Sequence, residues 1–136
     1  MKLIFVVLVL LSVVSFASSY SWKLCPGTDT SRIEVTEVNA DPTPITKGRV
    51  TKFQTKGIAK QNISQAYIRI DVYKQETRIF STTVGGSYAV NQGSKYEYTL
   101  PYTIPSFVPP GDYDGRISYV DNNSQVFTCV SVQLHF

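Results

Sequence analysis

Apolar and polar residues alternate with a period of two along most of this chain, which is typical of β-strands that bury one face. In the clearest run, residues 66–73, one face is apolar and consists of Ala66, Ile68, Ile70 and Val72. The same alternation predicts strands over 96–104 and 113–119. A last strand carries the apolar residues Val126, Val130, Val132, Leu134 and Phe136.

Weaker strand patterns cover residues 33–38, 50–55 and 78–81. Between the predicted strands lie groups of turn-forming residues at 41–44, 47–48, 85–86, 91–93, 109–111 and 121–123. Pro101 interrupts an alternating run, so we expect its strand to be an edge strand or to be bulged there. No segment predicts a helix. About seven short antiparallel strands with turns between them indicate an all-β, immunoglobulin-like β-sandwich.

The first nineteen residues have the pattern of a signal peptide. Met1 and Lys2 precede a run over 3–14 that is apolar apart from Ser12, which is the length of a signal-peptide core and too short for a membrane span. Cleavage after Ala17 or after Ser19 fits equally well, and an uncleaved signal anchor is the alternative. We therefore expect residues 1–19 to be removed, residues 20–136 to form one domain, and the protein to be secreted or to enter the endosomal or lysosomal lumen.

The chain has two cysteines, Cys25 and Cys129, near the two ends of the expected domain. An oxidising compartment favours a disulfide between them, which would tie the first strand to the last. Two buried free thiols, or a catalytic thiol with His135 as its partner, are the alternatives. The sequons at Asn62 and Asn122 are candidate glycosylation sites and are expected at the surface.

Charge and chemistry exclude several classes of function. Thirteen Lys and Arg residues against ten Asp and Glu give a net charge of +3. The basic residues are scattered, which argues against nucleic acid as a partner and permits only mild attraction to anionic membranes. His135 is the single histidine, and Asp112 and Asp114 lie within a glycine-flanked turn. We therefore expect no metal site, no cofactor and no catalytic centre, and a binding function is favoured over an enzyme.

The chain is rich in aromatic residues, with nine tyrosines and seven phenylalanines. Tyr96, Tyr98 and Tyr102 fall on one face of a predicted strand. An inward tyrosine needs a hydrogen-bond partner or a wet boundary for its hydroxyl. Such a row can line a cavity with a polar mouth, or it can belong to an ordinary packed core with hydroxyls at the edge of the sheet.

Several short motifs occur in an order that resembles a known family. They are the segment 21–25 (Ser-Trp-Lys-Leu-Cys), the turn 41–44 followed by Lys47-Gly48, the segment 96–98 (Tyr-Glu-Tyr), Ile104-Pro105, the segment 109–113 (Pro-Pro-Gly-Asp-Tyr), Asp121, Thr128-Cys129 and Phe136. Together they resemble the ML (MD-2-related lipid-recognition) domain, and within it Niemann-Pick type C2 proteins and the putative phosphatidylglycerol/phosphatidylinositol transfer proteins. The resemblance covers the whole expected domain.

The resemblance implies a sandwich whose sheets separate to hold a lipid in an internal hydrophobic cavity. The lipid would be carried between membranes with transient membrane contact. A monomer is the default expectation for so small a carrier. Family members commonly have three disulfides, of which the bridge between first and last strand corresponds to Cys25 and Cys129, and the other two are absent. The family's entrance corresponds to segment 104–109. The expected lipid-binding residues are Ile68, Ile70, Val72, Tyr98, Leu100, Tyr102, Ile104, Phe107, Val108, Pro109, Ile117 and Tyr119.

Phospholipid, as phosphatidylglycerol or phosphatidylinositol, is slightly favoured over sterol as the cargo because of the names of the most similar-looking relatives. Sterol binding and transport is the first alternative. An extracellular immunoglobulin-like recognition module with a fully packed core is an alternative of another class. A hydrolase that uses His135, Asp112 and Asp114 is the least favoured reading.

Overall fold

The computed structural model describes residues 20–136, so the signal-peptide prediction for residues 1–19 lies outside the described residues. Within the described part every regular element is a β-strand, and no helix there is long and apolar enough to cross a membrane. The strands are β1 (Trp22–Leu24), β2 (Ile33–Asp41), β3 (Val50–Ala59), β4 (Ile63–Lys74), β5 (Thr77–Val90), β6 (Lys95–Thr103), β7 (Asp112–Asp121) and β8 (Val126–His135).

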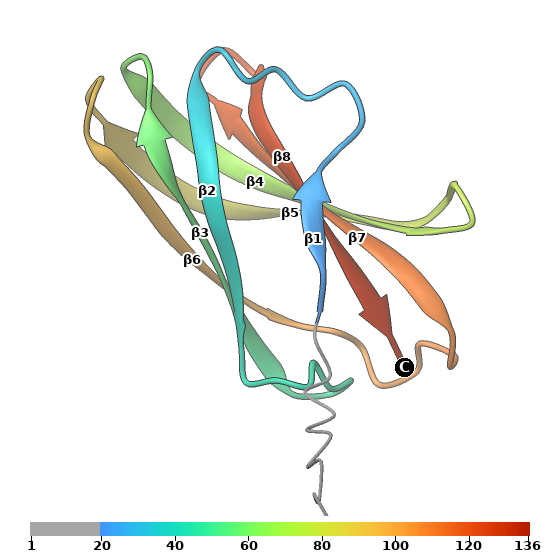
Figure 1. Ribbon diagram of the computed structural model, residues 1–136. Coiled ribbons are helices and arrows are strands. Elements are labelled where there is room, and N and C mark those ends of the chain that lie inside the picture. The colour runs from blue at the N-terminus through green and yellow to red at the C-terminus, as the bar shows by residue number, and fades with distance from the viewer. Residues whose placement is uncertain (1–19) are drawn as a thin grey trace, which may run out of the picture.

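The strands form two antiparallel sheets that face each other. The large sheet has the order β1-β8-β7-β4-β5, and the small sheet has the order β2-β3-β6. In Figure 1 the small sheet lies across the large one as a second layer. This arrangement confirms the predicted all-β sandwich, because each sheet buries the apolar face that its alternating sequence provides.

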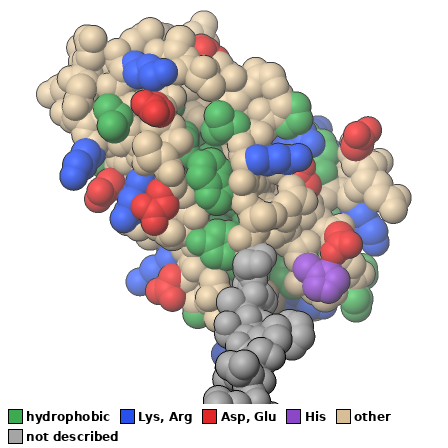
Figure 2. Space-filling view, viewed as in Figure 1, with side chains coloured by type: hydrophobic (Ala, Val, Ile, Leu, Met, Phe, Trp, Pro, Cys, Tyr) green, Lys and Arg blue, Asp and Glu red, His purple; other side chains and the backbone are tan. Residues whose placement is uncertain are grey.

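One side of the sandwich lies between β1 and β2, where the two sheets meet without strand pairing. Figure 2 shows a row of hydrophobic side chains between these two strands, with charged side chains to either side. Tyr20, Trp22, Leu24 and Val35 are half-buried and pack against the core from this region. The short strand β1 therefore covers core residues as well as extending the large sheet.

The predicted alternation in β4 holds from Ile68 onward but not before it. Ile68 and Ile70 are buried as expected, yet the inward residues before them are Ile63 and Gln65. The pairing shifts between Gln65 and Tyr67, so Ala66 lies at a β-bulge and changes the phase of the strand. A period-two pattern cannot reveal such a shift, because it assumes a constant register.

The prediction of a turn at Gly85-Gly86 is wrong, because both residues lie inside the 14-residue strand β5. Gly86 faces the interior, where a Cβ atom would overlap the hydroxyl of Tyr98, whereas a Cβ at Gly85 would meet nothing within 4 Å. The glycine at 86 therefore permits a close approach between the two sheets instead of a change of chain direction.

The start of the apolar face of β8 differs from the sequence pattern, whereas the position of Pro101 agrees with it. Val126 is 39% exposed, whereas Phe127 is fully buried, because the β7–β8 pairing shifts between Tyr119 and Val120. The apolar face of β8 thus begins with Phe127. The expectation for Pro101 is confirmed, since β6 is an edge strand of the small sheet and Pro101 is exposed.

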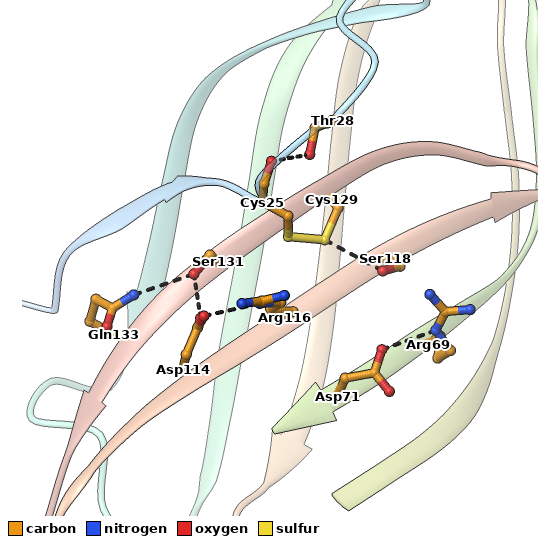
Figure 3. The surroundings of a disulfide bond; sticks show 10 residues. All are labelled: Cys25, Thr28, Arg69, Asp71, Asp114, Arg116, Ser118, Cys129, Ser131 and Gln133. Carbon is orange, nitrogen blue, oxygen red and sulfur yellow. Dashed lines mark hydrogen bonds and ion pairs between the residues drawn. A yellow bond between two sulfur atoms is a disulfide. The ribbon is translucent and has the colours of Figure 1, made fainter. Parts of the chain in front are cut away.

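The predicted disulfide between Cys25 and Cys129 is present, with 104 residues of sequence separation. It links the segment after β1 to β8, next to a backbone hydrogen bond from Cys25 to Cys129. Figure 3 shows its surroundings on the outer face of the large sheet, where Arg116 pairs with Asp114 and Arg69 pairs with Asp71, each at 3.0 Å. The outer face is therefore polar around the bridge, in contrast to the inner face.

Candidate functional site

An apolar cavity of about 150 Å³ lies between the two sheets at the end where β6 passes into the loop before β7. All twelve lining residues are hydrophobic or tyrosine. They are Val72, Ile79, Phe80, Tyr102, Ile104, Pro105, Phe107, Val108, Pro109, Tyr113, Leu134 and Phe136. The cavity is formed by both sheets and by the loop 104–111 that connects them.

A smaller void of about 30 Å³ lies beside this cavity, deeper in the core. It shares Val72, Tyr102, Ile104 and Leu134 with the larger cavity. Its inner boundary includes two cross-strand pairs, one from each sheet, that we call the cavity layer: Phe53 with Leu100, and Ile70 with Ile117. The two spaces share part of their walls and together make up an apolar region, which we call the apolar path, that reaches from the outer opening of the cavity toward the core.

The outer opening of the cavity, which we call the mouth, consists of Ile79, Phe80 and Phe107. Their exposed fractions are 50%, 40% and 84%, and Phe107 is the most exposed large hydrophobic residue in the described chain. Exposed apolar side chains that continue directly into an apolar cavity indicate a surface that binds apolar material.

Polar groups around the mouth hold its loop and carry positive charge. The Lys47 ammonium donates a hydrogen bond of 2.7 Å to the carbonyl of Val108, and the Tyr113 hydroxyl donates one of 2.7 Å to the carbonyl of Pro109. The Lys74 ammonium lies 5.4 Å from the centre of the Tyr113 ring. Burial raises the pKa of the Tyr102 hydroxyl, which lies among these groups. Two lysines thus contact the residues that line the cavity.

Beneath the cavity layer, two residues further along each strand, lies a group that we call the tyrosine layer. It consists of Thr55 paired with Tyr98 on β3 and β6, and Ile68 paired with Tyr119 on β4 and β7. Thr55 and Tyr119 are fully buried and share a hydrogen bond of 2.7 Å that joins the small sheet to the large one. Burial raises the pKa of Tyr119 above its usual range, although the hydrogen bond to Thr55 lowers it.

A second link between the sheets lies behind the tyrosine layer. The hydroxyl of Tyr96 on β6 donates a hydrogen bond to the Gln65 side chain on β4, and Gln65 donates one of 2.8 Å to the carbonyl of Gly86. Burial raises the pKa of Tyr96, and the neighbouring tyrosines raise it further. Among the described residues, these two links are the only side-chain hydrogen bonds that directly join strands of opposite sheets. Both lie at the end away from the mouth.

The structure divides the twelve predicted lipid-binding residues into two groups. Nine of them line the cavity or the void: Ile70, Val72, Leu100, Tyr102, Ile104, Phe107, Val108, Pro109 and Ile117. The other three, Ile68, Tyr98 and Tyr119, lie in the tyrosine layer and do not line either space. The tyrosine row was expected either to line a cavity or to belong to a packed core. Tyr96 and Tyr98 belong to the packed core, whereas Tyr102 lines the cavity.

Sequence reasoning missed several residues of the cavity. Phe53 on β3 and Ile79 and Phe80 on β5 contribute directly. The adjacent apolar residues at 79 and 80 were a usable signal. A half-buried strand alternates apolar and polar residues, so two large apolar residues in succession indicate that both faces of the strand meet apolar surroundings. The remaining missed residues are Tyr113, Gly115, Val132, Leu134 and Phe136, whereas Pro105 lies in the segment 104–109 that was expected to form the entrance.

Of the three candidate catalytic residues, the structure brings His135 and Asp112 together, whereas Asp114 bonds elsewhere. His135 and Asp112 form a pair on the surface, with side chains that are 82% and 86% exposed. In the hydrogen bonds of residues 20–136, no hydroxyl side chain contacts this pair, and Asp114 bonds instead to Arg116 and Ser131. The described chain also contains no group of three or more His, Cys, Asp or Glu residues that could hold a metal ion.

Both sequon asparagines lie at exposed positions outside the strands. Asn62 is in the turn between β3 and β4, where its side chain accepts a hydrogen bond of 2.8 Å from the backbone of Gln92. Asn122 is in the turn between β7 and β8. Their glycosylation stays a prediction.

Comparison with known proteins identifies the family. The ML domain matches residues 19–136. "Putative phosphatidylglycerol/phosphatidylinositol transfer protein 2" of Dictyostelium discoideum is 27% identical, over 95% of this chain and 93% of its own length. A second protein of that organism, "Putative phosphatidylglycerol/phosphatidylinositol transfer protein DDB_G0285639", is 26% identical over 82% of this chain and 79% of its own.

Two solved structures share the fold at low sequence identity. A Niemann-Pick type C2 protein from the Japanese carpenter ant has a TM-score of 0.67 and 10% identity, and covers 85% of this chain and 98% of its own. Chicken MD-1 complexed with lipid IVa has a TM-score of 0.63 and 13% identity, and covers 85% of this chain and 88% of its own. The match over residues 19–136 places this chain in the ML domain family.

Proposed function

We propose that this protein binds a lipid with the apolar part of the lipid in the cavity between the sheets, and transfers it between membranes. The observation that carries the proposal is the continuity between the exposed apolar mouth and a cavity lined by hydrophobic residues and tyrosines. A lipid chain is the ligand chemistry that matches an apolar path with an apolar surface opening. A small polar metabolite would find few partners there.

The names of similar proteins support the same class of ligand. Two relatives that cover most of this chain are named as phosphatidylglycerol/phosphatidylinositol transfer proteins, and a protein of the same fold was crystallised with lipid IVa. The cargo proposed here is therefore a phospholipid, with phosphatidylglycerol and phosphatidylinositol ahead of sterol.

The energetics of lipid exchange explain why a carrier is needed. Each methylene that leaves a membrane for water costs about 0.8 kcal/mol, so one sixteen-carbon chain costs on the order of 12 kcal/mol. A protein cavity that replaces the lost apolar contacts makes the exchange close to neutral and therefore reversible. Docking, extraction and release complete the transfer, and no covalent bond changes.

The cavity volume sets a requirement on binding. A dry cavity of about 150 Å³ is the size that accommodates one benzene molecule, and the cavity here has that volume. A whole acyl chain is larger, so loading requires the sheets to separate at the mouth. The loop 104–111 and the strand β5 are the elements that would move, since their residues form the opening.

The charges around the mouth favour an anionic headgroup. Lys47 lies against the lining residues Val108 and Phe136, and Lys74 lies against the lining residue Tyr113, so each puts a positive charge beside the cavity wall. A sterol hydroxyl carries no charge and gains nothing from these ammonium groups. Lysines near an anionic surface each contribute about 1 kcal/mol of attraction.

The proposed site of action is the secretory route, as a secreted protein or in the endosomal or lysosomal lumen. The signal-like segment 1–19 and the disulfide between Cys25 and Cys129 support this location, because disulfides persist in oxidising compartments.

The test uses protein incubated with vesicles that contain phosphatidylglycerol, phosphatidylinositol and cholesterol, followed by native mass spectrometry and organic extraction. The variants Ile70→Trp and Leu100→Trp fill the cavity layer, and Ile58→Trp places the same ring on an exposed position of β3 as a matched control. Circular dichroism establishes that each variant is folded.

The expected result is a bound phospholipid in the wild type and in Ile58→Trp, and its loss in the two cavity variants. If the protein binds a sterol and no phospholipid, the proposed cargo is wrong and the sterol alternative takes its place. Wild-type protein that takes up no lipid would overturn the proposed function, and would favour a recognition module that binds through its loops.

A further inference from the structure

The tyrosine layer closes the apolar path at a fixed depth. The cavity layer above it borders the void, whereas none of the four residues of the tyrosine layer lines the void or the cavity. Thr55, Ile68 and Tyr119 are fully buried, and Tyr98 is half-buried. Successive inward residues of a strand lie about 6.8 Å apart. The change from open cavity to closed core therefore takes place within one step along the strands.

Polar bonds make this boundary harder to displace than an ordinary apolar layer. The Thr55–Tyr119 hydrogen bond is buried and spans the two sheets. A lipid chain that pushed these residues apart would leave a hydroxyl without a partner in a dry environment, which is costly. A layer of leucine or valine would carry no such penalty and would move apart more readily.

Aromatic packing supports the boundary from behind. Tyr98 contacts Tyr119 with ring centres 6.2 Å apart, and Tyr88 with ring centres 5.8 Å apart, both in edge-to-face arrangements. The Tyr98 hydroxyl lies against Gly86, in space that the Cβ atom of any other residue at position 86 would need. Tyr98 is thus fixed in place by its ring contacts and by the strand β5.

We infer that Tyr98 and Tyr119 determine the length of the lipid chain that this protein accepts, by forming the closed layer behind the void, beyond which a chain cannot extend. This inference rests on the proposed function, and it concerns selection by chain length. Chains enter from the mouth, with the headgroup outside, and extend inward until they reach the tyrosine layer. Methylene groups beyond that depth stay outside the cavity and add no binding energy.

The test measures chain-length preference in the full protein. A graded series of phosphatidylglycerols with saturated chains of about eight to about eighteen carbons competes for binding, read by native mass spectrometry; in the wild type we expect affinity to rise with chain length and then level off at a limit. The variant Tyr98→Ala removes a ring from the tyrosine layer. Tyr88→Ala removes a half-buried ring of the same aromatic cluster that lies on β5, outside the tyrosine layer, and is the matched control.

The expected result is a limit that moves to longer chains by about two to five carbons in Tyr98→Ala, the depth of one layer, and that does not move in Tyr88→Ala. The milder variant Tyr98→Leu gives a smaller shift in the same direction, and it serves as the test if Tyr98→Ala does not fold. An unchanged limit in a folded Tyr98 variant overturns the inference and leaves the proposed function standing. A wild type that binds no member of the series overturns both.

Discussion

Arg32, just before β2, and Asp121, the last residue of β7, form an ion pair with 2.7 Å between Nη1 and Oδ2. The pair links the small sheet to the large one at the end away from the mouth. The Asp121 carboxylate also accepts hydrogen bonds of 2.9 Å from the backbone amides of Asn123 and Gln125. Burial alone would raise the pKa of Asp121, but these hydrogen bonds and the Arg32 charge outweigh it, so the pKa is lowered.

This lowered pKa predicts a specific acid sensitivity. A carboxyl group whose pKa is lower in the folded state stabilises the fold above its unfolded value of about 3.9, and the stabilisation is lost as pH falls through the folded value. We expect Asp121→Asn to reduce the free energy of unfolding at pH 7 by about 1.5–3 kcal/mol. The difference from the wild type should shrink below about pH 4, as measured by urea unfolding at several pH values.

The control for this experiment is Asp41→Asn, which changes an exposed carboxylate at the end of β2. It should leave stability within about 0.5 kcal/mol of the wild type at every pH. A loss in Asp121→Asn that stays constant down to pH 3 would contradict the assignment.

The Thr55–Tyr119 hydrogen bond predicts strong coupling between two substitutions. Tyr119→Phe leaves the Thr55 hydroxyl unpaired, and Thr55→Val leaves the Tyr119 hydroxyl unpaired, so each single change should cost about 1–3 kcal/mol. The double variant should cost clearly less than the sum, because neither partner is then left unpaired in the core. Urea unfolding of the four proteins measures the coupling, and purely additive losses would show that this bond contributes little.

Gly86 predicts a steric defect with a defined rescue. Gly86→Ala places a methyl group on the Tyr98 hydroxyl and should destabilise the fold by about 1–3 kcal/mol. Tyr98→Phe in the same chain removes that hydroxyl and should restore part of the loss. Gly85→Ala is the matched control, because nothing lies within 4 Å of its Cβ position. Equal effects at 85 and 86 in thermal unfolding would argue against the close approach.

The disulfide predicts a large contribution to stability. Closing a loop of 104 residues restricts the unfolded chain and stabilises the fold by up to about 4–5 kcal/mol. We expect the double variant Cys25→Ala with Cys129→Ala to lose a large part of this free energy in urea unfolding. Reduced wild-type protein should lose a similar amount, which separates the effect of the bond from that of the side chains.

Phe107 predicts a difference between binding and transfer. Phe107→Ser should slow lipid transfer between vesicles about tenfold. The reason is that burying an exposed phenylalanine ring in a membrane interface contributes a free energy that corresponds to about a tenfold change in rate. Lipid already bound should remain bound, since most of the cavity lining is unchanged. Ile58→Ser is the control, as Ile58 is 45% exposed and pairs with Lys95 at the end of the small sheet away from the mouth. Equal slowing in both variants would exclude a specific role for Phe107.

The sequence predicted the regular parts of this fold well. The alternation in β4 from Ile68 onward and in β6, the edge position of Pro101 and the bridge between Cys25 and Cys129 all follow from local chemistry. The strand β1 was not predicted, because three residues are too few to show a period. The extent of β5 was underestimated, because glycine at 85 and 86 has the composition of a turn.

The cavity was predicted less completely than the fold. The pattern along β4 and β6 shows which residues face inward, but it does not show how far along the strands the sheets stay apart. Ile68 and Ile70 have the same pattern, yet only Ile70 borders the void. Contacts between distant segments, such as Gly86 with Tyr98, bring the two sheets close together, and a pattern along one strand does not show them.

Both direct side-chain hydrogen bonds between strands of opposite sheets lie on the far side of the cavity. The proposed loading and release of a lipid therefore need neither of these two bonds to break. Cargo can come and go while the far half of the domain keeps its native contacts.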